Sequence, residues 1–172
     1  MIQVAGRRIG PARVALIALA VSACGQADAS SAPEMSNAQP SAEALVEAAL
    51  AALARNDRAA MESLLVTRDE HHDLLWASLP ESEHLTFDYA RWLNEHNTGK
   101  ALDRAIERLG GTEFSLVEIE YTKEREEYPG FTLHRGGKLI VVRESDGAEG
   151  ELILVDVLVE RPEGWKLLDY EE

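Results

Sequence analysis

The sequence is poor in cysteine, in basic residues and in long apolar runs, and each shortage excludes a class of protein. One cysteine, Cys24, among 172 residues can form no internal disulfide and cannot by itself make a metal site. The 31 acidic residues outnumber the 17 basic ones, and a net charge of −14 argues against a nucleic-acid partner. No apolar run reaches the roughly 20 residues that a membrane-spanning helix needs. The glycine-rich phosphate loop, the nucleophile elbow and the Cys/His catalytic arrangement are also missing, so we expect no cofactor and no metal.

The N-terminus instead has the parts of a bacterial export signal. Three arginines and no acidic residue precede an apolar run at 14–21, which has the length of a signal-peptide core. This run ends in a motif that resembles the lipobox of bacterial lipoproteins, an aliphatic residue followed by two small residues and a cysteine: Val21-Ser22-Ala23-Cys24. The resemblance implies cleavage between Ala23 and Cys24 and lipidation of Cys24.

Lipidation would attach the protein to the cell envelope, because each buried acyl methylene adds roughly 0.8 kcal/mol of membrane affinity. Gly25 follows the cysteine, where an aspartate would imply retention in the inner membrane. The resemblance therefore implies the outer membrane, facing the periplasm. The alternative is an ordinary secretory signal with an incidental cysteine. Without residues 1–23, which hold three of the basic residues and no acidic one, the chain has 149 residues and a net charge of −17.

The rest of the chain divides into a tether and one domain. After the lipidated cysteine, the stretch 24–40 is dominated by Ala, Ser, Pro, Asn and Gln and lacks hydrophobic periodicity, so we predict a disordered tether. Its 16 residues after Cys24 would reach roughly 20–24 Å. Residues 41–172 have the size of a single domain.

The first half of this domain has helical periodicity. Ser41 and Asp57 are predicted N-caps of a first and a second helix, and Thr67 with Glu70 fits a capping box that opens a third. Two further helices are expected at 84–97 and 98–109, the second of which starts at Thr98 and ends at Gly110-Gly111.

The second half alternates with a period of two, which predicts strands. The expected strands cover 113–122, 131–135, 138–144, 151–160 and 164–170, with hairpin turns at 136–137, 146–147 and 161–164. A change of parity predicts a bulge near Leu116 and Val117. The sequence therefore indicates an α+β fold, with N-terminal helices packed on a curved antiparallel sheet of four or five strands.

Two stretches, ALAALARNDRAAMESLL and LVERPEGWKLLDY, resemble the nuclear transport factor 2-like superfamily, the second because a turn with Gly and Trp joins its last two strands. The resemblance implies a cone in which the sheet wraps a helix around a pocket. Some members of that superfamily are enzymes and others are binding modules, so the fold does not select a function.

Asp156 is the strongest candidate for chemistry, because it interrupts a strand that is otherwise apolar on both faces. If the last hairpin closes with Arg161 opposite Gly164, Leu158 faces Leu167 and Asp156 faces Asp169. Two opposed carboxylates would form an acid/base pair or a cation site. The alternative is that Asp156 is neutralised by Lys138, Arg143 or solvent at a sheet edge.

Other candidates are weaker. His134 could act as a base beside Tyr121 or Tyr128, and Trp92 with Tyr89 and His96 could line a ligand groove. Adjacent histidines in the stretch DEHHD, residues 69–73, point about 100° apart on a helix, so a solvated helix start is preferred to a metal site.

Three functions remain open. The first is a lipid-anchored envelope module that binds a protein, a peptide or a small ligand. The second is a pocket enzyme with Asp156 as general base, assisted by Asp169, His134 or Tyr121, which needs a shared cavity of about 300 Å³ or more. The third is a structural envelope component whose acidic surface binds cations or basic segments.

Overall fold

Residues 34–171 are the part of the chain that the structure, a computed structural model, describes, and they belong to one unit. The motif at 21–24, with the lipidation site Cys24 and the cleavage site after Ala23, lies outside these residues. The helices are α1 (Ala42–Ala54), α2 (Arg58–Ser63), α3 (Arg68–Glu70) and α4 (Phe87–Leu109). A π-turn (His71–Leu75) and two 3₁₀ turns (Trp76–Ser78 and Pro80–Glu83) connect α3 to α4. The strands are β1 (Phe114–Tyr121), β2 (Glu126–Tyr128), β3 (Phe131–Arg135), β4 (Gly137–Arg143), β5 (Ala148–Ile153), β6 (Val155–Arg161) and β7 (Gly164–Tyr170).

The predicted caps at the starts of the first three helices are confirmed. The Ser41 hydroxyl accepts a hydrogen bond from Ala44 N at 3.1 Å, and the Asp57 carboxylate accepts one from Ala60 N at 3.0 Å. Thr67 and Glu70 form both halves of the capping box. Each cap satisfies backbone donors that the helix itself leaves unpaired, which is why a local sequence signal sufficed.

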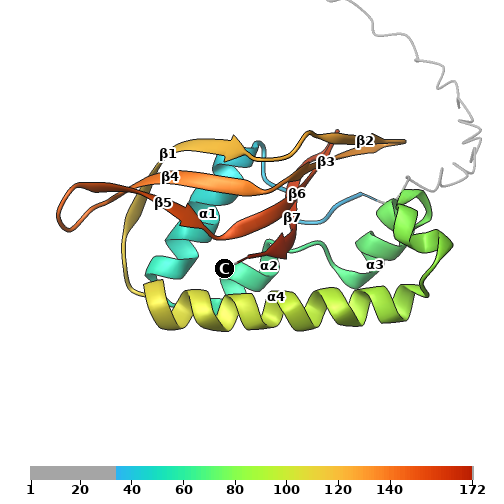
Figure 1. Cartoon of the computed structure of the whole chain (residues 1–172), viewed down its shortest axis with the longest axis horizontal. Coiled ribbons are helices and arrows are strands. Elements are labelled where there is room, and N and C mark those ends of the chain that lie inside the picture. The colour runs from blue at the N-terminus through green and yellow to red at the C-terminus, as the bar shows by residue number, and fades with distance from the viewer. Residues whose placement is uncertain (1–33, 172) are drawn as a thin grey trace, which may run out of the picture. The chain divides into compact units, whose positions relative to one another are not determined.

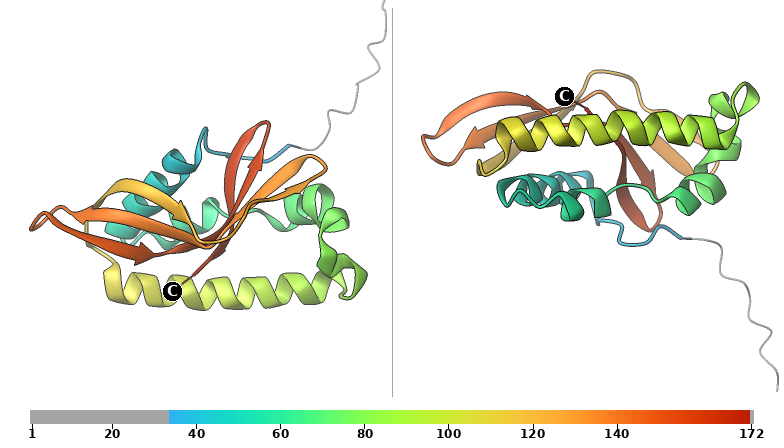
Figure 2. Two further views of the ribbon diagram at one scale, coloured as in Figure 1. Left: turned by 45° about the horizontal axis from the view of Figure 1, so that its top comes forward. Right: turned by 90° about the horizontal axis from the view of Figure 1, so that it is seen from below.

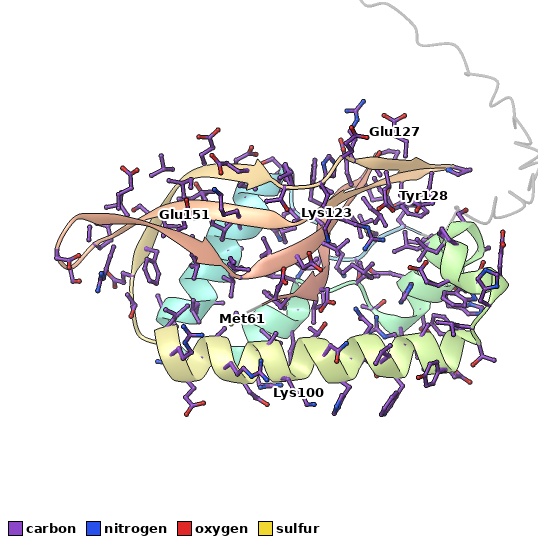
Figure 3. The ribbon with its side chains drawn as sticks, in the orientation of Figure 1. Met61, Lys100, Lys123, Glu127, Tyr128 and Glu151 are labelled. Carbon is purple, nitrogen blue, oxygen red and sulfur yellow. The ribbon has the colours of Figure 1, made fainter. Side chains whose placement is uncertain are left out.

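The two helices expected at 84–97 and 98–109 are a single helix, α4, and the predicted start at Thr98 is wrong. Thr98 is buried in the middle of α4, where its hydroxyl donates to the carboxylate of Asp169 instead of capping a helix end. Figure 1 shows α4 running beneath the strands from the α3 side to the α1 side. Figure 3 shows Lys100 on the side of α4 that faces away from the strands, and Met61 of α2 on the inner side.

The α+β class is confirmed, but the expected number of strands is wrong. The seven strands of the described region form two antiparallel sheets, with strand orders β1-β4-β5 and β2-β3-β6-β7. The stretch 151–160, expected as one strand, divides at Leu154 into β5 of the first sheet and β6 of the second. A short β2 adds the remaining strand.

The two sheets join at a corner where the chain crosses between them three times (Figures 1 and 2). The crossings are the stretch 122–125 between β1 and β2, Gly136 between β3 and β4, and Leu154 between β5 and β6. The hairpin predicted at Gly136-Gly137 is therefore wrong. Gly136 has φ +68°, a conformation that glycine adopts without steric cost, and this turns the chain out of one sheet into the other. A Cβ at Gly137 would lie 2.9 Å from the Val155 carbonyl, so the crossings at Gly136 and Leu154 pack closely against each other.

The predicted bulge in β1 and the other two predicted hairpin turns are confirmed. The register of β1 against β4 shifts between Leu116 and Glu118, which leaves Val117 in a bulge. Hairpins at 146–147 and 161–164 connect β4 to β5 and β6 to β7, with Arg161 opposite Gly164.

Two hydrophobic cores lie on opposite sides of the four-stranded sheet. The first joins α1, α2 and α4 to the strands and includes Leu158 and Leu167. The second includes Val157 and Leu168 with the π-turn residue Leu75. Adjacent residues of β6 and of β7 thus contribute to different cores, as alternation along a strand requires.

The N-terminal part of the described region packs against the domain. Met35 is 6% exposed within the second core, and Gln39 exchanges backbone hydrogen bonds of 2.9 and 2.8 Å with Trp165 of β7. The folded unit therefore includes residues 34–40, which the sequence assigned to the tether. Buried apolar surface and paired backbone groups compensate for the entropy of ordering this segment.

A buried ion pair fixes the same segment. Lys166 of β7, 1% exposed, donates to Glu70 of α3 at 2.8 Å. Glu70 also accepts hydrogen bonds from the Ser36 amide and hydroxyl and from the Thr67 amide, at 2.6, 2.7 and 2.8 Å. Burial alone would raise the pKa of Glu70, but these hydrogen bonds outweigh it and lower the pKa to about 2.

Candidate functional site

The candidate site lies at the corner between the two sheets. Asp156 is the second residue of β6, just after the crossing at Leu154. Its backbone carbonyl accepts a hydrogen bond from Gly136 N at 2.8 Å, and its side chain lies 3.3 Å from the same nitrogen. Asp156 is thus held by the crossing at Gly136, and it forms an ion pair with neither of the basic residues considered from the sequence. Lys138 pairs with Glu120 and Glu151, and Arg143 pairs with Asp146.

An irregularity in the last hairpin places Asp169 at the same corner. Leu158 pairs with Leu167 as predicted, but the register then shifts, and Asp169 pairs with Val157 rather than with Asp156. The predicted direct opposition of the two aspartates is therefore wrong by one residue. Their carboxylates nevertheless line one cavity and interact electrostatically.

Helix α4 packs against this corner and donates hydrogen bonds to two residues of β7. Thr98 donates its hydroxyl proton to the Asp169 carboxylate, and Asn94 donates its side-chain amide to the Leu168 carbonyl at 3.3 Å. Thr98 and Asn94 are one helical turn apart and therefore share a face of α4. This face fixes β7 at its irregular position.

We call the space enclosed here the corner cavity. Its volume is about 170 Å³, and its polar lining comprises His71, Glu81, Asn94, Arg135, Asp156 and Asp169. Its apolar lining comprises Trp76, Leu79, Ala90, Val157 and Leu168. Three carboxylates thus meet one guanidinium. That guanidinium is ion-paired with Glu126, with Arg135 Nε 2.8 Å from Glu126 Oε1, although the angle is unfavourable and the nitrogen forms no hydrogen bond. The lining carries a net negative charge.

His71 is the most unusual group in the corner cavity. Its side chain is buried, at 5% exposure, and neither ring nitrogen has a hydrogen-bond partner. The ring makes edge contacts with Trp76 and Phe87, at centroid distances of 6.1 and 5.4 Å. Burial, reinforced by the positive charge of Arg91, lowers the pKa of His71 to about 4. The ring is therefore neutral at physiological pH and offers one donor and one acceptor.

The local backbone explains how His71 reaches this position. It follows the capping box of α3 and opens the π-turn 71–75, a rare helical form that is frequent at functional sites. Adjacent side chains on a helix point in different directions, and here His71 is buried whereas His72 is exposed. His71 could not be predicted from the stretch DEHHD, because the pattern does not show which of the two histidines packs against Phe87 in the interior.

Asp169 has the second strong pKa shift in the corner cavity. Burial raises the pKa of Asp169 to about 6, and the negative charge of Asp156 adds to this, while the hydrogen bond from Thr98 opposes it. Asp169 therefore exchanges a proton near neutral pH. Together, the two carboxylates and the imidazole can accept hydrogen bonds from a bound molecule or exchange a proton with it.

The remaining residues predicted from the sequence lie elsewhere. His134 contacts Tyr121 and Trp165, with centroids 5.2 and 4.8 Å apart, and its Nε2 lies 2.9 Å from Glu160. Burial, with the charges of Glu43 and Glu160, raises the pKa of Tyr121 to about 12. This cluster does not line the corner cavity, so the structure does not bring His134 or Tyr121 to the two aspartates.

Trp92 lies on the outer surface of α4, 56% exposed. It stacks against Tyr89 and His96, with centroids 6.0 and 5.4 Å apart. The three rings thus cover each other's faces, and none of them lines the corner cavity.

A larger hollow of about 480 Å³ lies between α1 and β1. Its polar lining residues, Glu47, Arg55, Glu113 and Ser115, are all exposed. It lacks a buried polar group that would fix a ligand, so the corner cavity is the better candidate despite its smaller volume.

Among residues 34–171, no group of three or more His, Cys, Asp or Glu side chains is arranged to hold a metal ion. Within the same range, none of the helices has both the length and the apolar character needed to cross a bilayer. No protein-family model matches the chain, and neither a curated protein nor a solved structure matches it.

Proposed function

We propose that the protein is a lipid-anchored binding module of the bacterial cell envelope, and that the corner cavity is its ligand site. The observation that carries the binding role is His71, a buried imidazole with two unpaired nitrogens in a cavity that it shares with two carboxylates. Leaving a buried polar group unpaired costs about 1–3 kcal/mol, which a ligand would recover on binding. The volume of about 170 Å³ suits a small ligand or one side chain of a peptide or protein.

The sequence supports the anchor. A cysteine preceded by Val21, Ser22 and Ala23, at the end of a signal-like run, would be cleaved and acylated, and Gly25 favours the outer membrane. The folded unit would then be held in the periplasm by the short stretch between Cys24 and Glu34. We also propose a distant relationship to the nuclear transport factor 2-like superfamily. The caps at Ser41 and Asp57, the bulged β1 and the closing hairpin support it.

A pocket enzyme is the second candidate, favoured by the raised pKa of Asp169 beside the charge of Asp156. In that function Asp156 would be the general base and Asp169 the acid. The cavity is smaller than the roughly 300 Å³ expected for a substrate pocket, so binding without turnover is better supported. A purely structural acidic component would instead associate through surface charge and would show a steep salt dependence.

Site-specific photo-crosslinking in living cells tests the binding role. A photoreactive amino acid would replace Glu81, which is exposed at the cavity, in the full-length protein, with the same replacement at Glu149 of β5 as control. We expect an adduct from position 81 only, and its loss when Asp156→Asn and Asp169→Asn are added. Equal adducts at both positions, or an adduct that ignores the two aspartates, would contradict a ligand site in the cavity.

The anchor is tested separately. The variant Cys24→Ser should no longer incorporate a radioactive fatty acid and should leave the membrane fraction. Unchanged labelling would refute lipidation at Cys24 without affecting the crosslinking result.

A further inference from the structure

We infer that the corner cavity binds an alkylammonium group, with the nitrogen received by Asp156, Asp169 and His71. This inference rests on the proposed function, since it names the ligand class of the proposed site. The charge, the donor and acceptor pattern and the size of the cavity support it.

The charge of the lining selects a cation. The titratable groups that face the cavity are Glu81, Asp156, Asp169, His71 and Arg135. Arg135 is already paired with Glu126 at 2.8 Å, and the buried His71 ring is neutral because burial lowers its pKa to about 4. An anionic ligand would meet uncompensated carboxylates in a partly desolvated space, which is strongly unfavourable.

The donor and acceptor pattern selects an ammonium among cations. An ammonium group has three N–H donors and no acceptor. Two carboxylates and the free imidazole nitrogen are three acceptors of this kind, and the nitrogen of His71 has no other partner. A bound ammonium would thus pair the acceptor nitrogen of the ring at the same time as it compensates the two carboxylates.

The size and the apolar wall select a short alkyl stem. A volume of about 170 Å³ equals that of roughly five or six water molecules, which corresponds to a group of about five or six non-hydrogen atoms. Trp76, Val157 and Leu168 supply the apolar wall against which methylene groups would pack. A butylammonium group has five such atoms. Both a small free amine and the end of a lysine side chain offer this chemistry.

Calorimetric titration of the full-length protein in mild detergent tests the inference. The probes are n-butylammonium, n-butanol and butyrate, which have similar size but carry a positive charge, no charge and a negative charge. We expect n-butylammonium to bind at least about tenfold more tightly than either of the others. Asp169→Asn and Asp156→Asn should each weaken it roughly tenfold or more, whereas Glu124→Gln, an exposed change of the same charge, should leave it unchanged.

The pH adds an independent readout. Because burial and Asp156 raise the pKa of Asp169 to about 6, n-butylammonium should bind about tenfold more weakly at pH 5 than at pH 8. The variant Asp169→Asn should lose most of this dependence. A dependence that persists in this variant would contradict the assigned role of Asp169.

A histidine-labelled sample separates failure of the inference from failure of the proposed function. Binding in the cavity should shift the ring-nitrogen signals of His71 and not those of His84, which is exposed. If n-butanol or butyrate shifts His71 as strongly as n-butylammonium, the ammonium class is wrong although the cavity binds ligands. If n-butylammonium leaves His71 unchanged, the inference is overturned, and the crosslinking result alone then decides the proposed function.

A capped lysine, Nα-acetyl-lysine methylamide, distinguishes the two sources of the group. Binding at least as tight as that of n-butylammonium supports insertion of a partner's lysine side chain. Binding of n-butylammonium without binding of the capped lysine supports a small free amine. Failure of both contradicts the inference.

Discussion

Replacement of Asp169 by asparagine should stabilise the fold at neutral pH, although it removes a group of the proposed site. In the folded protein, burial and the charge of Asp156 raise the pKa of Asp169 to about 6, from the ordinary value of 3.8. The side-chain oxygen of asparagine can still accept the hydrogen bond from Thr98. The substitution therefore removes the unfavourable charge while it keeps the local structure.

The size and the pH range of this effect follow from the pKa shift. The folded state binds the proton of Asp169 more tightly than the unfolded state, so the associated stability is complete below pH 3.8 and is lost as the pH rises through about 6. A shift of about two pH units corresponds to about 3 kcal/mol. Solvent screening of the partly exposed carboxylate reduces this, so we expect a gain of about 1–3 kcal/mol at pH 8 and almost none at pH 4.

Urea unfolding of the wild type and the variant at several pH values between 4 and 8 measures the effect. The matched control is Glu124→Gln, which removes one negative charge from an exposed loop and should change the free energy of unfolding by less than about 0.5 kcal/mol. A loss of stability in Asp169→Asn at pH 8, or a gain of equal size at pH 4, would refute the reasoning.

Three further predictions concern the ion pair, the N-terminal segment and the second aspartate. Glu70→Ala should lower the free energy of unfolding by about 3–5 kcal/mol, because it leaves Lys166 charged and buried. In urea unfolding, Glu70→Met with Lys166→Met should recover only part of this loss, because the donors of Ser36 and Thr67 still lack their acceptor. The depressed pKa of Glu70 predicts that wild-type stability falls as the pH drops from about 4.5 to 2, and the double variant should lack this part of the acid dependence. Met35→Ala should cost about 2–5 kcal/mol in the same assay, whereas a cost near zero would show that the segment is not part of the fold. Asp156→Asn should lower the pKa of Asp169, measured by NMR titration, and an unchanged pKa would contradict their electrostatic coupling.

Features of the fold that depend on local chemistry could be predicted from the sequence. The caps at Ser41, Asp57 and Thr67 arise from side chains that bond to backbone groups three residues away, and the turn at Gly147 arises from a positive φ. Such interactions are complete within a few residues. For this reason the short-range pattern was sufficient, and the α+β class followed from it.

Features that depend on distant partners could not be predicted. A glycine with positive φ is compatible both with a hairpin turn and with a crossing between sheets. At Gly136 the chain forms a crossing because β4 packs against β6, which is a long-range contact. Thr98 has the chemistry of a cap, but its partner is Asp169, 71 residues further on.

Only part of the candidate site could be predicted, because some of its residues depend on distant partners. Asp156 was conspicuous because a carboxylate in an apolar strand needs an explanation, and Asp169 followed from the hairpin register. His71 was missed because its burial depends on packing against Trp76 and Phe87, which has no sequence signal of its own. His134 could not be placed because both faces of β3 are partly covered.

The most direct test of the ligand site is a crystal structure of the protein grown with n-butylammonium. We expect the nitrogen within about 3 Å of a carboxylate oxygen of Asp156, a carboxylate oxygen of Asp169 and one ring nitrogen of His71, with the butyl chain against Trp76. A cavity that holds only water, with the amine bound elsewhere or nowhere, would contradict the account.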